Sequence, residues 1–180
     1  MARKVGMIVL IFVGFVGVAV VRSIYDFREQ NDQIGAFIAV AADYANADVT
    51  GEPSEDVTPA LRGKVITIDT DKDTVDSLTF PKLSEGLRAM KPEEVGTVVR
   101  IQWSKERVGV YKDTKTAEET GDAFRSFGKV SIIDWEQKKV IGSKTFVGDA
   151  PVKGLTRDGG FQGEWPMFEI VQYLEGLPRS

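Results

Sequence analysis

The chain has 180 residues, of which 42% are hydrophobic and 28% charged, with a formal net charge of −4 and a sequence pI near 5.0. This balance is typical of a folded protein, and an acidic chain without a cluster of lysine and arginine makes nucleic acid a poor partner. Because cysteine and histidine are both absent, disulfides, thiolate or imidazole metal sites, histidine-held haem and triads with a histidine base are excluded. We expect no cofactor.

Residues 1–23 are predicted to form a transmembrane anchor. The run from Val5 to Val21 contains only apolar residues and glycine, which is at the short end of the roughly 17 to 25 residues that span a bilayer as a helix. Arg3 and Lys4 precede the run, so the positive-inside rule places the N-terminus in the cytoplasm and the C-terminal domain outside. The alternative is a cleaved signal peptide and a secreted protein, although the apolar run is longer than a usual signal core.

Two segments are expected between the anchor and the folded domain. Residues 24–45 are predicted to form an amphipathic stalk helix, and residues 46–60 collect proline, glycine, serine and acids without a period, which is typical of a linker. The folded domain is therefore expected at residues 61–180. The apolar stripe of the stalk consists of Ile24, Phe27, Ile34, Ile38, Ala41 and Ala45.

The domain is predicted to be α+β, with a small, mostly antiparallel sheet and a C-terminal packing helix. Three pairs of strand-like segments flank charged turns, and each pair is typical of a hairpin. The segment KLSEGLRAM, after the first pair, is typical of a short helix. The expected hairpins join residues 64–69 to 75–80, 97–103 to 108–111, and 124–134 to 140–147.

The closing segment EWPMFEIVQYLEGLP carries the strongest helix signal of the domain. Pro166 suits a first turn, an apolar stripe follows it, and Gly176 with Pro178 provides a stop. We expect this helix to pack on one face of the sheet, with the helices on one side of it. The buried face is predicted to contain Val65, Thr67, Val98, Ile101, Val130 and Ile132.

The stretches GKVITID and GKVSIID resemble each other and end in Asp69 and Asp134. An aspartate at the end of a strand is favoured because its carboxylate accepts hydrogen bonds from the free amides of a turn. We therefore interpret the two stretches as hairpins of similar construction and not as a duplicated catalytic unit.

The turn after the first stretch is rich in acids. Asp69, Asp71 and Asp73 form a D-x-D-x-D pattern, which opens many calcium loops because alternate carboxylates converge on one cation. Thr74 stands where such a loop needs glycine, and Phe80 where it needs glutamate. The pattern favours a solvated acidic turn, and weak metal binding by the three aspartates is the alternative.

Residues 148–166 form a glycine-rich irregular stretch before the C-terminal helix. Loops that precede a rigid element often carry binding residues, so Arg157 is a candidate anion clamp and Trp165 a candidate stacking surface. The alternative is a connector whose glycines only permit tight turns. The full set of candidate ligand-binding residues is Arg157, Asp158, Glu164, Trp165, Trp103 and Trp135.

Together these patterns predict a single-pass membrane-anchored protein whose outward domain binds a protein or an envelope polymer and catalyses no reaction. One alternative is a carboxylate-dependent extracytoplasmic hydrolase, which would draw on Asp69, Asp134 and Glu164. Another is an accessory subunit whose membrane helix packs inside a larger complex.

Overall fold

The computed structural model of the chain describes residues 33–52, 58–112, 116–151 and 163–180. The chain divides into two units, Met1–Ala36 and Phe37–Ser180. The predicted anchor from Val5 to Val21 and residues 24–32 of the predicted stalk lie outside the described residues. Within the described ranges, no helix is both long and apolar enough to cross a membrane.

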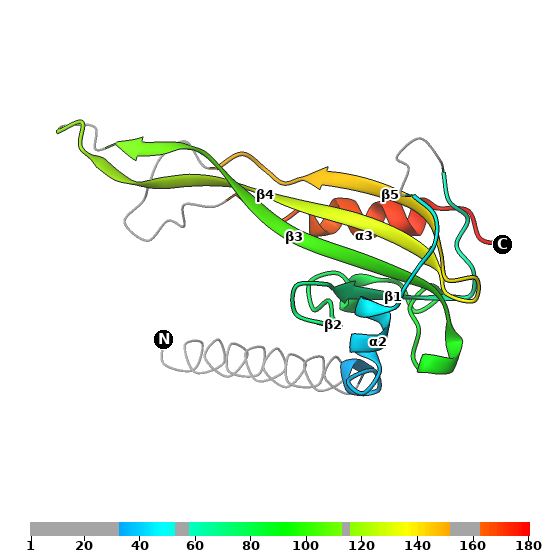
Figure 1. Ribbon diagram of the computed structural model, residues 1–180. Coiled ribbons are helices and arrows are strands. Elements are labelled where there is room, and N and C mark those ends of the chain that lie inside the picture. The colour runs from blue at the N-terminus through cyan, green and yellow to red at the C-terminus, as the bar shows by residue number, and fades with distance from the viewer. Residues whose placement is uncertain (1–32, 53–57, 113–115, 152–162) are drawn as a thin grey trace, which may run out of the picture. The chain divides into compact units, whose positions relative to one another are not determined.

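The unit Phe37–Ser180 is built on a five-stranded sheet with the order β2-β1-β3-β4-β5 (Figure 1). Strand β1 runs parallel to β3, and all other neighbours are antiparallel. The sheet is therefore mostly antiparallel and carries a C-terminal helix, which confirms the α+β class. The strands are β1 Lys64–Asp69, β2 Thr74–Val75, β3 Val95–Lys112, β4 Glu119–Asp134 and β5 Lys139–Val147.

Of the predicted hairpins, the one formed by β4 and β5 is confirmed, and the one at residues 97–111 is wrong. The SKER segment lies inside the single long strand β3 and pairs with residues 124–127 of β4. It contains no glycine, proline or asparagine, the residues that a tight hairpin turn favours. The first hairpin forms only at its turn, because β2 has two residues.

The predicted helix in KLSEGLRAM is also wrong. Its first residue, Lys82, ends the 3₁₀ helix η1 Phe80–Lys82, and the rest forms a turn and a single bridge from Arg88 to Val65 before the 3₁₀ helix η2 Pro92–Glu94. Its backbone bonds to β1 instead: the Val65 amide donates to Leu87 O, and the Ala89 amide donates to Val65 O. These bonds hold the chain in an extended form that a helix cannot provide.

Two α-helices, α2 Ala41–Asn46 and α3 Met167–Gly176, pack on opposite faces of the sheet. Arg100 donates from Nε to Tyr44 O at 2.8 Å and so contacts α2. A Cβ at Gly128, which pairs with Trp103, would lie 2.8 Å from Ile170 Cδ1 of α3. Residues 100 and 103 point to opposite faces because side chains alternate along a strand. The expectation that the helices share one side is therefore wrong.

The core follows from this two-sided cover, because both faces of the central strands are apolar. Five of the six predicted core residues lie on the α3 face, whereas Val98 pairs with Ile66 on the α2 face. The α2 face also buries Ile68 and Ile133. Residues buried on the α3 face are Val65, Thr67, Val99, Ile101, Val130 and Ile132.

The compact unit begins upstream of Leu61, where the domain was expected to start. The Phe37 ring lies 5.7 Å from that of Phe80, and the Tyr44 ring lies 4.7 Å from that of Trp135. Thr50 exchanges backbone hydrogen bonds with the turn before β5, through Lys138 O and the Val140 amide. The segment around α2 is thus part of the folded unit.

Candidate functional site

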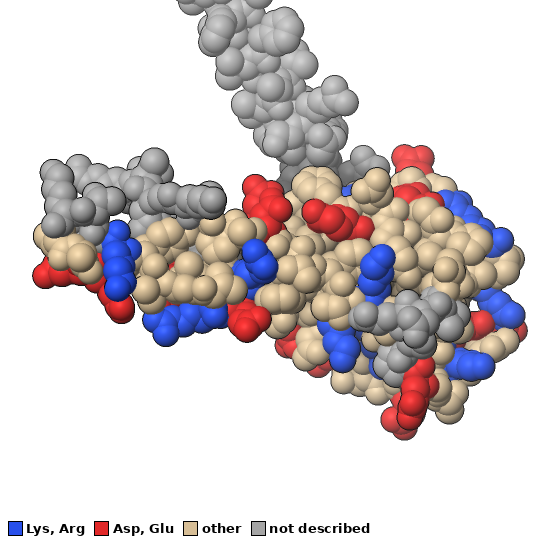
Figure 2. Space-filling view, turned by 90° about the horizontal axis from the view of Figure 1, so that it is seen from above, with Lys and Arg blue, Asp and Glu red and all other residues tan. Residues whose placement is uncertain are grey.

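The distal parts of β3 and β4 project beyond the rest of the sheet (Figure 1). β1 pairs with β3 only as far as Ile101, whereas β4 pairs with β3 as far as Lys112. We call residues 104–112 and 119–127 the arm. Residues 104–109 are all exposed, and Val108 keeps 47% of its surface in solvent. In Figure 2 the arm is the coloured projection at the left, and it carries basic and acidic side chains close together.

The arm is fastened to the body by a buried carboxylate. Asp76 is 1% exposed; its Oδ2 accepts from Trp103 Nε1 at 2.6 Å, and its Oδ1 accepts from the amide and hydroxyl of Thr79, both at 2.7 Å. The Thr79 hydroxyl gives its one proton to Asp76, so in its 2.9 Å contact with Thr67 it accepts from the Thr67 hydroxyl. Three donors thus satisfy the buried carboxylate, which fixes the side chain of Trp103 where the arm begins.

Two of the candidate binding residues meet at this base. The rings of Trp103 and Trp165 lie 5.3 Å apart in an edge-to-face arrangement, and both side chains are half-buried. Glu164 is exposed beside them. Trp135 belongs to another part of the molecule, where it packs against Tyr44 and beneath the Lys138 ammonium. Arg157 and Asp158 lie outside the described residues.

The glycine-rich stretch before α3 is closed at its two ends. The Gly148 amide donates to Ser126 O at 2.8 Å, and the Gly163 amide donates to Phe124 O at 3.0 Å. A Cβ on Gly148 would lie 2.1 Å from Glu164 O, and one on Gly163 would lie 2.0 Å from a backbone oxygen of Asp149. Only glycine permits this crossing, so at these two positions the glycines have a definite structural role.

Charged side chains of the arm make contacts across its two strands. Arg107 Nε lies 2.7 Å from Asp122 Oδ1, with both side chains about half exposed. The Lys105 ammonium lies 5.0 Å from the centre of the Phe124 ring. Exposed pairs of this kind contribute little to stability, so the arm owes its form mainly to the backbone ladder between β3 and β4.

Asp69 and Asp134 have the turn role that the sequence predicts. Asp69 Oδ1 accepts from the Asp71 amide at 3.1 Å, and Asp134 Oδ1 accepts from the Gln137 amide at 3.1 Å. Each also pairs with a cation: Lys72 lies 2.5 Å from Asp69, and Arg62 lies 3.1 Å from Asp134. The hydrogen bond to Asp69 raises the pKa of Lys72.

This pairing gives no support to a cation site at Asp69, Asp71 and Asp73. The Lys72 ammonium forms an ion pair with the Asp69 carboxylate, and Asp73 Oδ1 accepts a hydrogen bond from Asn46 Nδ2 at 3.1 Å. Among the described residues, no group of three acidic side chains is placed to hold a metal ion.

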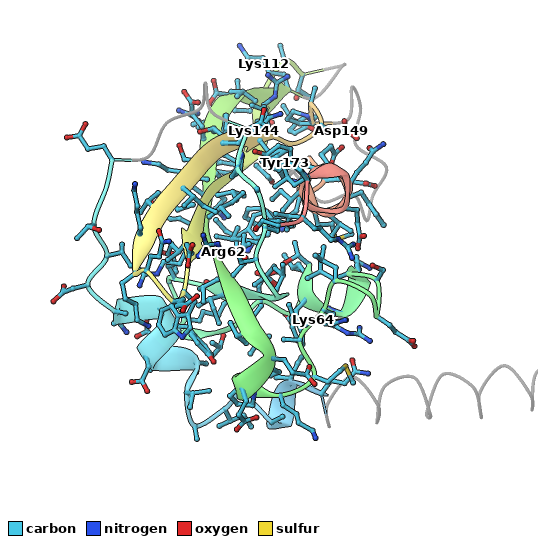
Figure 3. All side chains as sticks on the ribbon, turned by 90° about the vertical axis from the view of Figure 1, so that its right-hand side faces the viewer. Arg62, Lys64, Lys112, Lys144, Asp149 and Tyr173 are labelled. Carbon is cyan, nitrogen blue, oxygen red and sulfur yellow. The ribbon has the colours of Figure 1, made fainter. Side chains whose placement is uncertain are left out.

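A cavity of about 460 Å³ lies near the end of β4 that is remote from the arm. Arg62 lies beside it, with its guanidinium between Asp134 and Glu136. Figure 3 views the molecule from the end opposite the arm, with Arg62 and the arm residue Lys112 labelled. No local pattern predicted this cavity, whose polar lining includes Glu52, Gln137 and Lys139.

A third surface lies where α3 crosses β5. The Phe146 and Tyr173 rings lie 5.4 Å apart, and the Lys144 ammonium lies 4.6 Å from the centre of the Tyr173 ring (Figure 3). Burial raises the pKa of the Tyr173 hydroxyl. These contacts hold the helix on the sheet, because Phe146 is itself buried.

Lys105 and Arg107 are the arm residues that sequence reasoning missed. The misassigned turn at SKER hid them, because a charged run of this kind occurs both in turns and on exposed strands, and only its pairing with β4 shows one continuous strand. Comparisons of the chain with protein-family models, with curated proteins and with solved structures found no match.

Proposed function

We propose that this protein is a single-pass membrane-anchored interaction module. The run from Val5 to Val21 holds it in the membrane, and the outward domain presents the arm to a protein partner. The observation that carries the proposal is the exposure of residues 104–109 on strands that continue beyond the buried sheet.

An exposed arm has little to contribute to folding. A two-stranded hairpin is only marginally stable in water when nothing covers it, and residues 104–109 on the β3 side of the arm are all exposed. Residues of a strand that lie outside the core are available to a partner, and rigid attachment lowers the entropy lost on binding. The fixed position of Trp103 at the base provides such an attachment.

The chemistry of the arm favours a protein over an envelope polymer. Alternating charges and the exposed Val108 give it the mixed character of a protein surface. Trp103 and Trp165 are half-buried against each other, so they offer no open, flat pair of rings for a sugar chain.

The geometry lends the hydrolase alternative no support. Asp69 and Asp134 pair with Ile101 and Thr97 on either side of β3, which separates them by about 13 Å along the strand alone. The paired carboxylates of glycosidases lie within roughly 5 to 10 Å of each other. Each aspartate is also bound to a turn amide and a cation.

A topology experiment tests the anchor. Because the chain has no cysteine, a single Ser180→Cys change provides one labelling site. In intact cells a membrane-impermeant maleimide should label the C-terminus, and the protein should remain in the membrane fraction. Full-length protein in the soluble fraction, or labelling only after lysis, would contradict the anchor.

Photo-crosslinking tests the arm. A benzophenone amino acid at Val108 should form one discrete adduct in cells, whereas the same group at Glu136, exposed near the remote end of the sheet, should not. Equal adducts at both positions, or none at Val108, would refute the arm as the interaction surface.

Exchange of the anchor separates this proposal from an accessory subunit. Replacing residues 5–21 with an unrelated membrane span should leave the Val108 adduct intact, because the arm makes the contact. Loss of the adduct with normal membrane insertion would instead indicate that the helix itself packs in a complex.

A further inference from the structure

Among the residues that the structure describes, strand β3 has a free outer edge along the arm. On the side of β1, its last backbone partner is the Thr70 amide, which donates to Ile101 O at 3.1 Å. Among the described strands, none pairs with that side of β3 beyond Ile101. The amides and carbonyls of every second residue point to the same side of a strand, so Trp103, Lys105 and Arg107 present theirs to this edge.

The pairing of β4 confirms this direction independently. Phe124 O and Ser126 O accept from Gly163 and Gly148, on the side of β5. In the ladder, Phe124 is opposite Arg107 and Ser126 is opposite Lys105. When one member of an antiparallel pair bonds away from the ladder, so does the other. The backbone groups of Lys105 and Arg107 therefore face outward, toward a partner strand.

The side chains at this edge have a definite charge pattern. Lys105 and Arg107 lie on the α3 face of the sheet, and Ser104 and Glu106 lie on the other face. Asp122 contacts Arg107 through Nε, which leaves the terminal guanidinium nitrogens for another carboxylate. A strand added here would place its own alternate side chains beside the two cations.

This pattern disfavours a second copy of the chain as the occupant. If two β3 edges paired antiparallel about Glu106, Lys105 would lie opposite Arg107 twice, and Glu106 would lie opposite itself. Like charges directly opposite each other destabilise a sheet, and charged residues on an edge block self-association. The same cations attract a strand with acidic side chains at alternate positions.

We propose that the arm binds an extended acidic segment of a partner protein, which adds as a strand to the outer edge of β3 at residues 104–107. The inference rests on the proposed function and specifies the chemistry of its partner. Main-chain hydrogen bonds to Lys105 and Arg107 supply affinity, and carboxylates beside the two cations supply specificity. The bulge after Arg107 ends this register and keeps the added strand short.

The test uses the full-length protein in detergent micelles and a capped seven-residue peptide of alternating valine and glutamate. By nuclear magnetic resonance, the peptide should slow amide exchange at Lys105 and Arg107. The Glu106 amide, which faces β4, should not change. A peptide of alternating valine and lysine should bind at least tenfold more weakly.

A proline separates backbone recognition from charge. Lys105→Pro and Lys105→Ala both remove the ammonium group, but only proline removes the outward amide, and proline is tolerated at a free edge. Lys105→Pro should bind the glutamate peptide about fivefold to tenfold more weakly than Lys105→Ala. If the proline variant fails to fold, Lys105→Glu with Arg107→Glu should reverse the preference toward the lysine peptide.

Three results would overturn strand addition: no protection of Lys105 and Arg107 at saturating peptide, equal affinity of the proline and alanine variants, or equal binding of both peptides. A wild-type dimer that Lys105→Pro dissolves would identify a second copy as the occupant and would equally refute the acidic strand. If these tests fail while the Val108 adduct persists, the proposed function stands and only the mode of binding is wrong. Absence of the adduct refutes the proposed function itself.

Discussion

The two halves of the β3–β4 hairpin share one backbone ladder but differ in what covers them. Residues 95–101 of β3 are mostly buried between α2 and α3, whereas residues 104–109 are all exposed. The first half reads VGTVVRI and the second SKERVG. The backbone pairing of β3 with β4 thus continues beyond the point where the helices stop covering the sheet. At the same point the side chains of β3 change from apolar to charged.

This difference separates positions that hold the fold from positions that are free to bind. Burial on both faces makes the first half sensitive to any lost methyl group, because interiors are closely packed. The second half contributes mainly its backbone ladder. The first of four comparisons tests this contrast directly, and the other three test the contacts that hold the body and the base of the arm.

The largest effect is expected in the core. Ile132→Ala removes a side chain that is 0% exposed and should lower the free energy of unfolding by about 2–5 kcal/mol. Val108→Ala in the arm should change it by less than about 0.5 kcal/mol. Denaturant titration of both variants measures the contrast, and equal losses would show that the arm belongs to the core.

The second-largest loss of stability is expected where the two ends of the glycine-rich stretch cross. A Cβ at Gly163 would overlap a backbone oxygen of Asp149, whereas one at Gly176 meets nothing within 4 Å. Gly163→Ala should therefore cost close to the upper end of the roughly 1–3 kcal/mol seen for overpacking, and Gly176→Ala should cost little. Thermal unfolding of the two variants measures this difference. A Gly163→Ala variant as stable as wild type would refute the close crossing of the backbone at Gly163.

The buried carboxylate at the base of the arm comes third. Asp76→Asn places an amide NH₂ against a donor, either Trp103 Nε1 or Thr79, which should cost about 1–2 kcal/mol. The exposed Asp71→Asn is the matched control. Trp103 fluorescence should also change in the Asp76 variant alone, and a variant as stable as the control would refute the network.

The smallest effect concerns alkaline pH. The pKa of Lys72 is raised in the folded state by its bond to Asp69, so the stability from this pair is fully present below about pH 10.5. It should be lost as pH rises through the raised folded value. Urea unfolding at pH 9 and at pH 12 should show wild type approaching a Lys72→Gln variant at the higher pH, and a constant difference would contradict the link.

Local signals predicted the parts of the fold that depend on local chemistry. The apolar stripe around Ile170 and Leu174 predicted α3, and strand-end aspartates predicted the turns at Asp69 and Asp134. The continuity of β3 could not be read in the same way, because a charged run such as SKER occurs in turns and on exposed strands alike. Only its pairing with β4 decides between them.

The candidate site was accessible to sequence reasoning only in part. The sequence predicts Trp103 and Trp165 separately as candidate binding residues. Their contact could not be predicted, because it depends on the chain before α3 returning to the base of the arm. The outward direction of the Lys105 and Arg107 backbone depends on strand order and register, which no local pattern encodes. The cover of the second face by α2 has the same origin.

The central claim is that the arm is separable from the body that carries it. Glu106 and Arg125 form a hydrogen-bonded pair of the ladder, so an Asn-Gly turn can replace residues 107–124 between them. The most direct measurement is the thermal unfolding of this full-length variant. The variant loses the bond from the Gly163 amide to Phe124 O, which is worth about 1 kcal/mol, so a single cooperative transition within about 5 °C of wild type is predicted. Loss of cooperative unfolding, or a fall of more than about 10 °C, would show that the arm is part of the core and contradict the account.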